Sequence, residues 1–161
     1  MIGLKRNDGI DAFISGTTPI LRYGLLAGVL SGLVLGITMK LLERLTGSAV
    51  YMLLLNVDFI DWLPQPLPEL AEFALHLIVA LPLGMLFLAL LRIWKSPLGL
   101  GLGMGLALAC CTWIPLTQLS ERVPSSADIA ALLWWITGHL LYGTVLAYFG
   151  KSWIKKGRDK Q

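Results

Sequence analysis

Apolar residues along this chain gather into four stretches, each long enough to cross a lipid bilayer. A helix needs roughly 20 apolar residues to span the hydrocarbon core, so each stretch predicts one transmembrane helix. We therefore predict an all-α, integral membrane four-helix bundle in which residues 1–161 form a single transmembrane domain. The expected spans are about 19–42, 70–93, 98–116 and 129–149, with an external segment at 43–69 and tails at 1–18 and 150–161.

Short polar motifs precede three of the expected helices. Capping hydroxyls and a proline at the first helical position favour helix starts at Thr18–Pro19 and Ser96–Pro97. Ser125 and Asp128, three residues apart, resemble a capping box before the fourth span.

The external segment holds an apolar run, Ala49 to Leu63, that is too short to span a membrane. Tyr51, Phe59 and Trp62 within it are of the aromatic type enriched at membrane interfaces. We expect a helix that lies on the outer leaflet or dips into it. A re-entrant lid over the bundle is the alternative.

Composition agrees with this picture, because 56% of the residues are hydrophobic and 14% are charged, against about 25% charged in a typical soluble domain. Most of the 13 basic residues flank the expected spans on the side that carries both termini. Basic residues concentrate on the cytoplasmic side of membrane proteins. We therefore predict a bacterial inner membrane protein with both termini in the cytoplasm, membrane lipids as partners, and no binding of nucleic acid.

Small residues recur at four-residue spacing on several of the expected helices, and this spacing places them on one helix face. Such faces allow close helix packing, and we expect contacts within one chain, with dimerisation as the alternative. The first span would pack on the third or the fourth. The predicted packing residues are Gly24, Gly28, Gly32, Gly36, Gly99, Gly103 and Gly143, within stripes that include 99–103–107, 101–105–109 and 139–143–147.

Few polar side chains lie inside the spans, and each is a candidate functional residue because such groups are costly in a bilayer. His139 lies in the fourth span, where it is either a neutral ring bonded to a backbone or hydroxyl oxygen, or a proton relay or cofactor ligand. His76 follows Glu72 by four residues on one helix face, which is a weak pattern for a metal site. Counting helical rise from the outer boundary separates the two histidines by about 9 Å in depth, which argues against a shared haem. We predict no metal site and no cofactor.

Two further features complete the candidates. Pro82, with Gly84 two residues later, is a candidate hinge in the second span, because proline usually kinks a helix. Cys110 and Cys111 are adjacent in an apolar run, and we expect small buried residues there rather than a disulfide.

Several motifs share the outline of a known group of proteins: His76 in an apolar span, K-S-P-L-G-L-G-L-G-M-G at 95–105, T-G-H-L-L-Y-G at 137–143, and G-L-L-A-G-V-L-S-G at 24–32. In these features the chain resembles the YagU-like and YqhR-like families of small bacterial membrane proteins. The resemblance implies four spans in an inner membrane and no assigned reaction. Residues 49–68 depart from it.

No nucleophile–base pair, phosphate loop or Cys-x-x-Cys pair is present in the sequence, so we expect no enzyme. The sequence favours a structural or accessory role through helix packing, either as a homo-oligomer or with another membrane protein. A small oligomeric transporter or channel that uses His139 is the first alternative, and a haem- or metal-binding subunit is the second.

Overall fold

The computed structural model describes residues 8–58, 60, 62–64, 66–120 and 122–158, with side chains described between 20 and 155. Within these residues the chain folds into helices joined by loops. The helices are α1 (Asp8–Thr46), α2 (Val50–Leu55), α3 (Glu69–Leu91), α4 (Pro97–Thr117) and α5 (Ile129–Arg158). In the described part of the chain, four helices are long and apolar enough to cross a membrane: Ile20–Thr46, Glu69–Leu91, Pro97–Thr117 and Ile129–Lys155. The protein is thus an all-α, multi-pass membrane protein.

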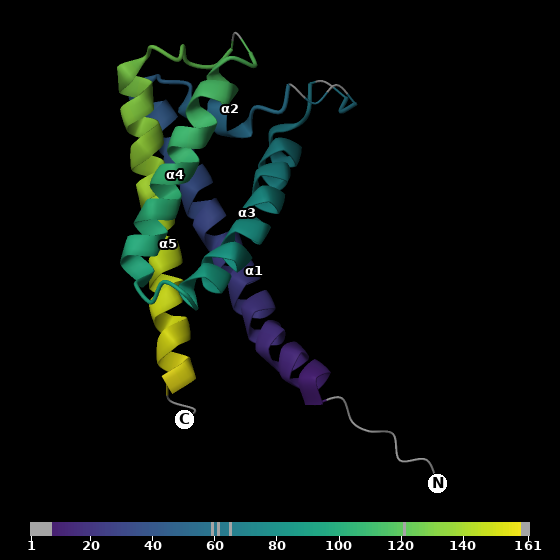
Figure 1. Ribbon diagram of the computed structural model, residues 1–161. Helices are drawn as coiled ribbons and strands as arrows, with labels where there is room; N and C mark the ends of the chain where they lie inside the picture. Colours follow the sequence, from purple (N-terminus) through teal and green to yellow (C-terminus); the bar gives the residue numbers. More distant parts are fainter. Residues whose placement is uncertain (1–7, 59, 61, 65, 121, 159–161) are drawn as a thin grey trace.

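The long helices associate as two pairs. α1 packs on α3, α4 packs on α5, and contacts between α1 and α5 join the pairs (Figure 1). α3 touches α4 and α5 only lightly. The start of α1 and the end of α5 lie at the same end of the molecule, opposite α2.

Two helices run further than the sequence predicts. α1 starts at Asp8, so Thr18–Pro19 lies inside a helix and is not its start. α5 continues to Arg158, because Trp153 and Ile154 still pack against the core.

Two of the predicted helix starts are found at the expected places. Ser96 precedes Pro97 at the start of α4, although its hydroxyl makes no capping hydrogen bond. Before α5, the carboxylate of Asp128 accepts a hydrogen bond of 2.9 Å from the Ala131 N–H. Asp128 therefore caps α5 directly, instead of supporting Ser125 in a capping box.

The glycines of α1 lie where α1 crosses α3. A Cβ added to Gly28 would overlap the carbonyl oxygen of Ala80, and one added to Gly24 would lie 2.7 Å from the Cα of Met85. The backbones of the two helices are thus in direct contact, which only residues without a side chain allow. The same face continues through Gly32 and Gly36, whose added Cβ atoms would meet Ala80 and the ring of Phe73.

The partner of this face differs from the expectation, because α1 packs its glycines on the second span and not on the third or fourth. α3 offers a small pair of its own, Ala80 and Gly84, one turn apart and both buried. A Cβ on Gly84 would lie 2.6 Å from the Cα of Gly28. Gly84 is therefore a position of close helix approach. The hinge at Pro82 stays a prediction, since α3 is helical on both sides of the proline.

α4 and α5 form the second close contact, again through small residues. Added Cβ atoms on Gly101 and Gly143 would each overlap the carbonyl oxygen of the other. An added Cβ on Gly105 would overlap the carbonyl oxygen of His139. The predicted stripe 101–105–109 of α4 thus packs on the stripe of α5 that contains His139, and this contact places the His139 ring in the bundle.

α2 closes one end of the bundle. It has six residues, and four of them are buried: Val50, Tyr51, Leu53 and Leu55. α2 packs on α1, α3 and α5, so this part of the external segment is covered by protein, whereas Trp62 is 80% exposed. Phe59 lies outside the described residues.

Candidate functional site

A cavity of about 360 Å³ lies between the two helix pairs, below α2. We call it the histidine cavity, because His76 of α3 and His139 of α5 both line it. Most of its wall is apolar and comes from α1, α3, α4, α5 and the residues after α2. The polar lining residues are Asn56, Glu72, His76, Thr112, His139 and Tyr142.

His139 is 4% exposed, and its partners fix the state of each ring nitrogen. Nδ1 lies 2.9 Å from the carbonyl oxygen of Trp135 on the same helix. A carbonyl can only accept, so Nδ1 carries the hydrogen and donates it. In the neutral ring Nε2 is then an acceptor, and it has no hydrogen-bond partner among the described residues. The Trp135 ring packs on the imidazole with 4.5 Å between ring centroids.

His76 has the opposite arrangement. Its Nε2 lies 3.2 Å from the carbonyl oxygen of Gly32 on α1, so this nitrogen donates and Nδ1 is the acceptor in the neutral ring. The bond ties α3 to α1 at the glycine contact. The ring of Phe73, one turn earlier on α3, lies 5.9 Å away between centroids.

Two buried donors of the cavity lining lack partners among the described residues: the Asn56 side-chain amide nitrogen and the Tyr142 hydroxyl. The Oδ1 of Asn56 accepts a hydrogen bond of 3.1 Å from the Asp58 N–H, which fixes the side-chain orientation. The Tyr142 hydroxyl approaches that of Ser31 without reaching hydrogen-bond geometry. Buried polar groups are nearly always bonded, so unpaired donors mark a place for a bound molecule or water.

A polar network holds α2 over the cavity. The Glu43 carboxylate of α1 accepts hydrogen bonds from the backbone N–H groups of Tyr51, at 2.8 Å, and Met52, at 3.0 Å. The Tyr51 hydroxyl donates to Glu69 at 2.9 Å, and Glu69 also pairs with Lys40. Burial raises the pKa of the Tyr51 phenol, and its hydrogen bond to Glu69 raises the pKa further.

One ion pair joins the segment after α2 to the α4–α5 connection beside the cavity. Arg122, between α4 and α5, lies 3.7 Å from Asp58, which follows α2. Trp113 of α4 is held to the same connection by a hydrogen bond of 3.1 Å to the Ser126 carbonyl oxygen. These contacts link the segment over the cavity to the α4–α5 pair.

The structure thus brings together all three polar candidates from the sequence, Glu72, His76 and His139. His76 and His139 line the same cavity, despite the difference in depth of about 9 Å that we counted from the sequence. Sequence reasoning missed Asn56 and Tyr142, whose unpaired groups have no signature in a local pattern.

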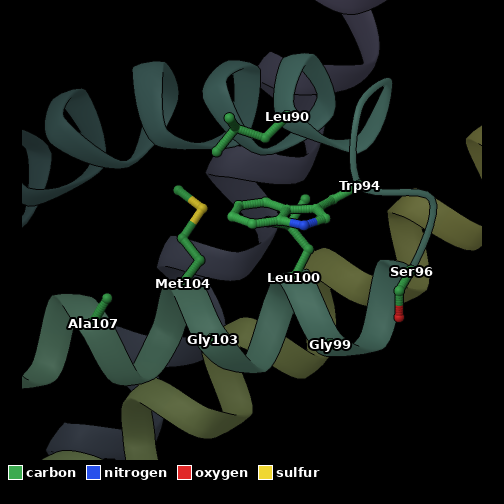
Figure 2. Close-up of a pocket in the computed structure, with 8 residues that line it drawn as sticks. All are labelled: Leu90, Trp94, Ser96, Gly99, Leu100, Gly103, Met104 and Ala107. Atoms are coloured by element: carbon green, nitrogen blue, oxygen red, sulfur yellow. The ribbon is translucent and has the colours of Figure 1, made fainter.

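The remaining packing candidates, Gly99 and Gly103, lie away from the histidine cavity. They are exposed along α4 and line a separate apolar groove of about 630 Å³ at the α3–α4 connection. Figure 2 shows the Trp94 indole reaching over this groove toward Met104, with Leu90 of α3 opposite.

The expectation of buried cysteines is wrong, since Cys110 and Cys111 are both exposed. The buried face of α4 runs through Gly101, Gly105, Ala109 and Trp113. Helical geometry turns the residues after Ala109 away from that face.

No family model, curated protein or solved structure matches the chain.

Proposed function

We propose that this protein binds a small, mainly apolar molecule inside the membrane, in the histidine cavity. The observation that carries the proposal is the set of unpaired polar groups within an apolar wall: the acceptor nitrogens of His76 and His139 and the donors of Asn56 and Tyr142. Ligand sites are typically apolar pockets of about 300–1,000 Å³ with a few polar groups that fix orientation. The role corresponds to the binding step of a small transporter, and a purely structural protein would have no need for this cavity.

The route of entry is lateral, from the lipid. Ile78 and Val79 line the cavity, yet 58% and 61% of their surfaces are exposed. Both belong to the middle part of α3, and this part of the helix faces lipid when the chain spans a bilayer. A molecule dissolved in the membrane would therefore reach the cavity between α3 and the α4–α5 pair.

The distribution of basic residues supports an inner-membrane orientation with both termini in the cytoplasm. In that orientation α2 and the Asp58–Arg122 pair lie on the external side, and the cavity lies in the outer half of the bilayer. Reporter fusions after residue 161 test this: a fusion active only in the periplasm should stay silent, and activity there would reverse the orientation.

The binding proposal is tested at the rim of the cavity. Val79→Trp should obstruct entry without disturbing the core, because Val79 is exposed. Leu86→Trp is the matched control, since Leu86 is also exposed on α3 but does not line the cavity. Mass spectrometry of small molecules extracted from purified protein should find a stoichiometric compound with wild type and Leu86→Trp, and not with Val79→Trp. Equal recovery from all three proteins, or none from any, would reject the proposal.

A second role, association with another copy of the chain, is favoured by the outer face of α4. Among the helical glycines whose surroundings the structure describes, the exposed ones are Gly99 and Gly103. A Cβ added to Gly103 would have no atom within 4 Å. Ala107 and Cys110 continue the same face. Small faces pack on small faces in both close contacts of this fold, so the matching surface for this face is the same face of a second copy.

The native Cys110 tests this association directly. Mild oxidation in native membranes should give a disulfide-linked dimer, and Gly103→Leu should abolish it by separating the helices. Ala74→Leu, an exposed position on α3, is the control and should leave the dimer intact. Failure of the wild-type chain to cross-link would speak against the association.

A further inference from the structure

Charge is distributed unevenly around the outer end of the histidine cavity. Among the described acidic residues there, Glu69 pairs with Lys40, Asp58 pairs with Arg122, and Glu43 is bonded to the backbone of α2. Glu72 lines the cavity and makes no ion pair with a described residue. Arg122 attracts Glu72 electrostatically, but its ion pair is with Asp58. No lysine or arginine lines the cavity among the described residues.

Three acceptors in the cavity complement this charge, beside the two unpaired donors of Asn56 and Tyr142. Nδ1 of His76 and Nε2 of His139 are acceptors in the neutral rings, and the Glu72 carboxylate is a third acceptor. A ligand that meets all three must donate hydrogen bonds. His76 lies one turn from Glu72 on the same face of α3, so one donor group can reach both.

The aromatic rings in the wall add a surface for the apolar part of a ligand. Trp135 and Tyr142 are 1% exposed and line the cavity. A metal ion is a poorer match, because no group of three or more His, Cys, Asp or Glu side chains in the described part of the chain could hold one.

We propose that the molecule bound in the histidine cavity is a hydrophobic organic amine in its cationic form. This inference rests on the proposed binding function and names its ligand class. The ammonium group lies between Glu72 and His76, where the carboxylate balances its charge. The apolar body extends along Leu75, Leu83 and Leu108 toward Trp135.

The test uses two probes of equal shape, 2-phenylethylammonium and the neutral 2-phenylethanol, on the purified full-length chain in detergent. Binding to the folded state stabilises it by RT ln(1 + c/Kd), where c is the free probe concentration, so the dependence of the thermal unfolding midpoint on probe concentration reports the affinity. The ammonium probe should stabilise wild type at least tenfold more potently than the alcohol. Glu72→Gln should weaken binding of the ammonium probe at least tenfold, which corresponds to about 1.4 kcal/mol.

Two variants separate the charge from the fold. Glu72→Asp keeps the carboxylate and should retain affinity within about threefold. Asp128→Asn removes a carboxylate at the start of α5 that does not line the cavity, and because asparagine still caps the helix, probe affinity should be unchanged. Far-ultraviolet circular dichroism establishes that each variant is helical before probe is added.

The outcomes distinguish the ligand class from the binding function. One possible outcome is that both probes bind equally, that Glu72→Gln does not change their affinity, and that Val79→Trp abolishes it. In that case the cationic ligand class is wrong, but the cavity still binds small molecules. If neither probe binds wild type, the cationic class is again overturned, and the mass spectrometry of co-purified compounds then decides the binding function independently.

Discussion

The crossing of α1 and α3 gives the sharpest prediction about stability. Gly28→Ala adds a methyl group whose position overlaps the Ala80 carbonyl oxygen and lies 3.0 Å from the Cα of Leu81. Both are backbone atoms, so no side-chain rotation can relieve the overlap, and the helices must move apart. Separation also weakens the contacts of Gly24 and Gly32 on the same face.

The magnitude follows from two opposing effects. Overpacking a close contact costs typically 1–3 kcal/mol, and contact with backbone places this site near the upper value of about 3 kcal/mol. Alanine gains roughly 1 kcal/mol over glycine in helix propensity. The expected net loss is therefore about 2 kcal/mol. Gly103→Ala, measured with the chain diluted to a monomer in the micelles, is the control for the propensity effect, because its added Cβ meets nothing within 4 Å in the single chain.

Gly84→Ala makes the test stricter. Gly84 and Gly28 face each other across the crossing, so the separation forced by one methyl group also makes room for the other. The double variant should lose about 1 kcal/mol less than the sum of the single losses, since neighbouring sites are coupled. Reversible unfolding in mixed micelles, followed by circular dichroism, measures the free energies of unfolding of wild type, the two single variants, the double variant and Gly103→Ala. Single variants as stable as Gly103→Ala, or strictly additive losses, would refute direct backbone contact at this crossing.

Three further predictions concern single sites. Tyr51 has a raised pKa, so its phenol should stay protonated in the folded protein above pH of about 10, where a free tyrosine ionises. Because the unfolded chain ionises first, the contribution of Tyr51 to stability is full below pH of about 10 and is lost as pH rises toward the folded pKa, a loss that Tyr51→Phe should not show in unfolding measured against pH. Asp128→Ala should destabilise the protein by about 1 kcal/mol in the same unfolding assay, because the Ala131 N–H loses its cap, whereas Asp128→Asn should retain most of the stability. Cys110 and Cys111 should both react with a small maleimide in the folded protein in detergent; protection until unfolding would contradict their exposed positions.

Hydropathy and helix length were enough to predict the four membrane-crossing helices. The pairing of those helices was harder to predict, because α1 carries four glycines in register, whereas α3 carries one pair of small residues at four-residue spacing, Ala80 and Gly84. A single small pair at four-residue spacing is a weak signal by itself. It becomes decisive only when the opposite helix supplies the complementary glycines.

The candidate site was predictable in its members but not in its assembly. His139, His76 and Glu72 stand out because ionisable residues are rare in spans. These three side chains line one cavity because α3 crosses α1 and stands apart from α4 and α5. Counting residues from the membrane boundary gives only the depth of each side chain and says nothing about how the helices cross. The part played by Asn56 depends on α2, whose placement follows from Glu43 and Glu69 binding Tyr51 across the chain.

The most direct test of ligand binding is an experimental high-resolution structure of the chain purified gently from its native membrane. We expect continuous density in the histidine cavity that is larger than water, within hydrogen-bond distance of His76 or His139, and in contact with Trp135. A cavity that holds only ordered water, or that has closed through contact of α3 with α4 and α5, would contradict the proposed function.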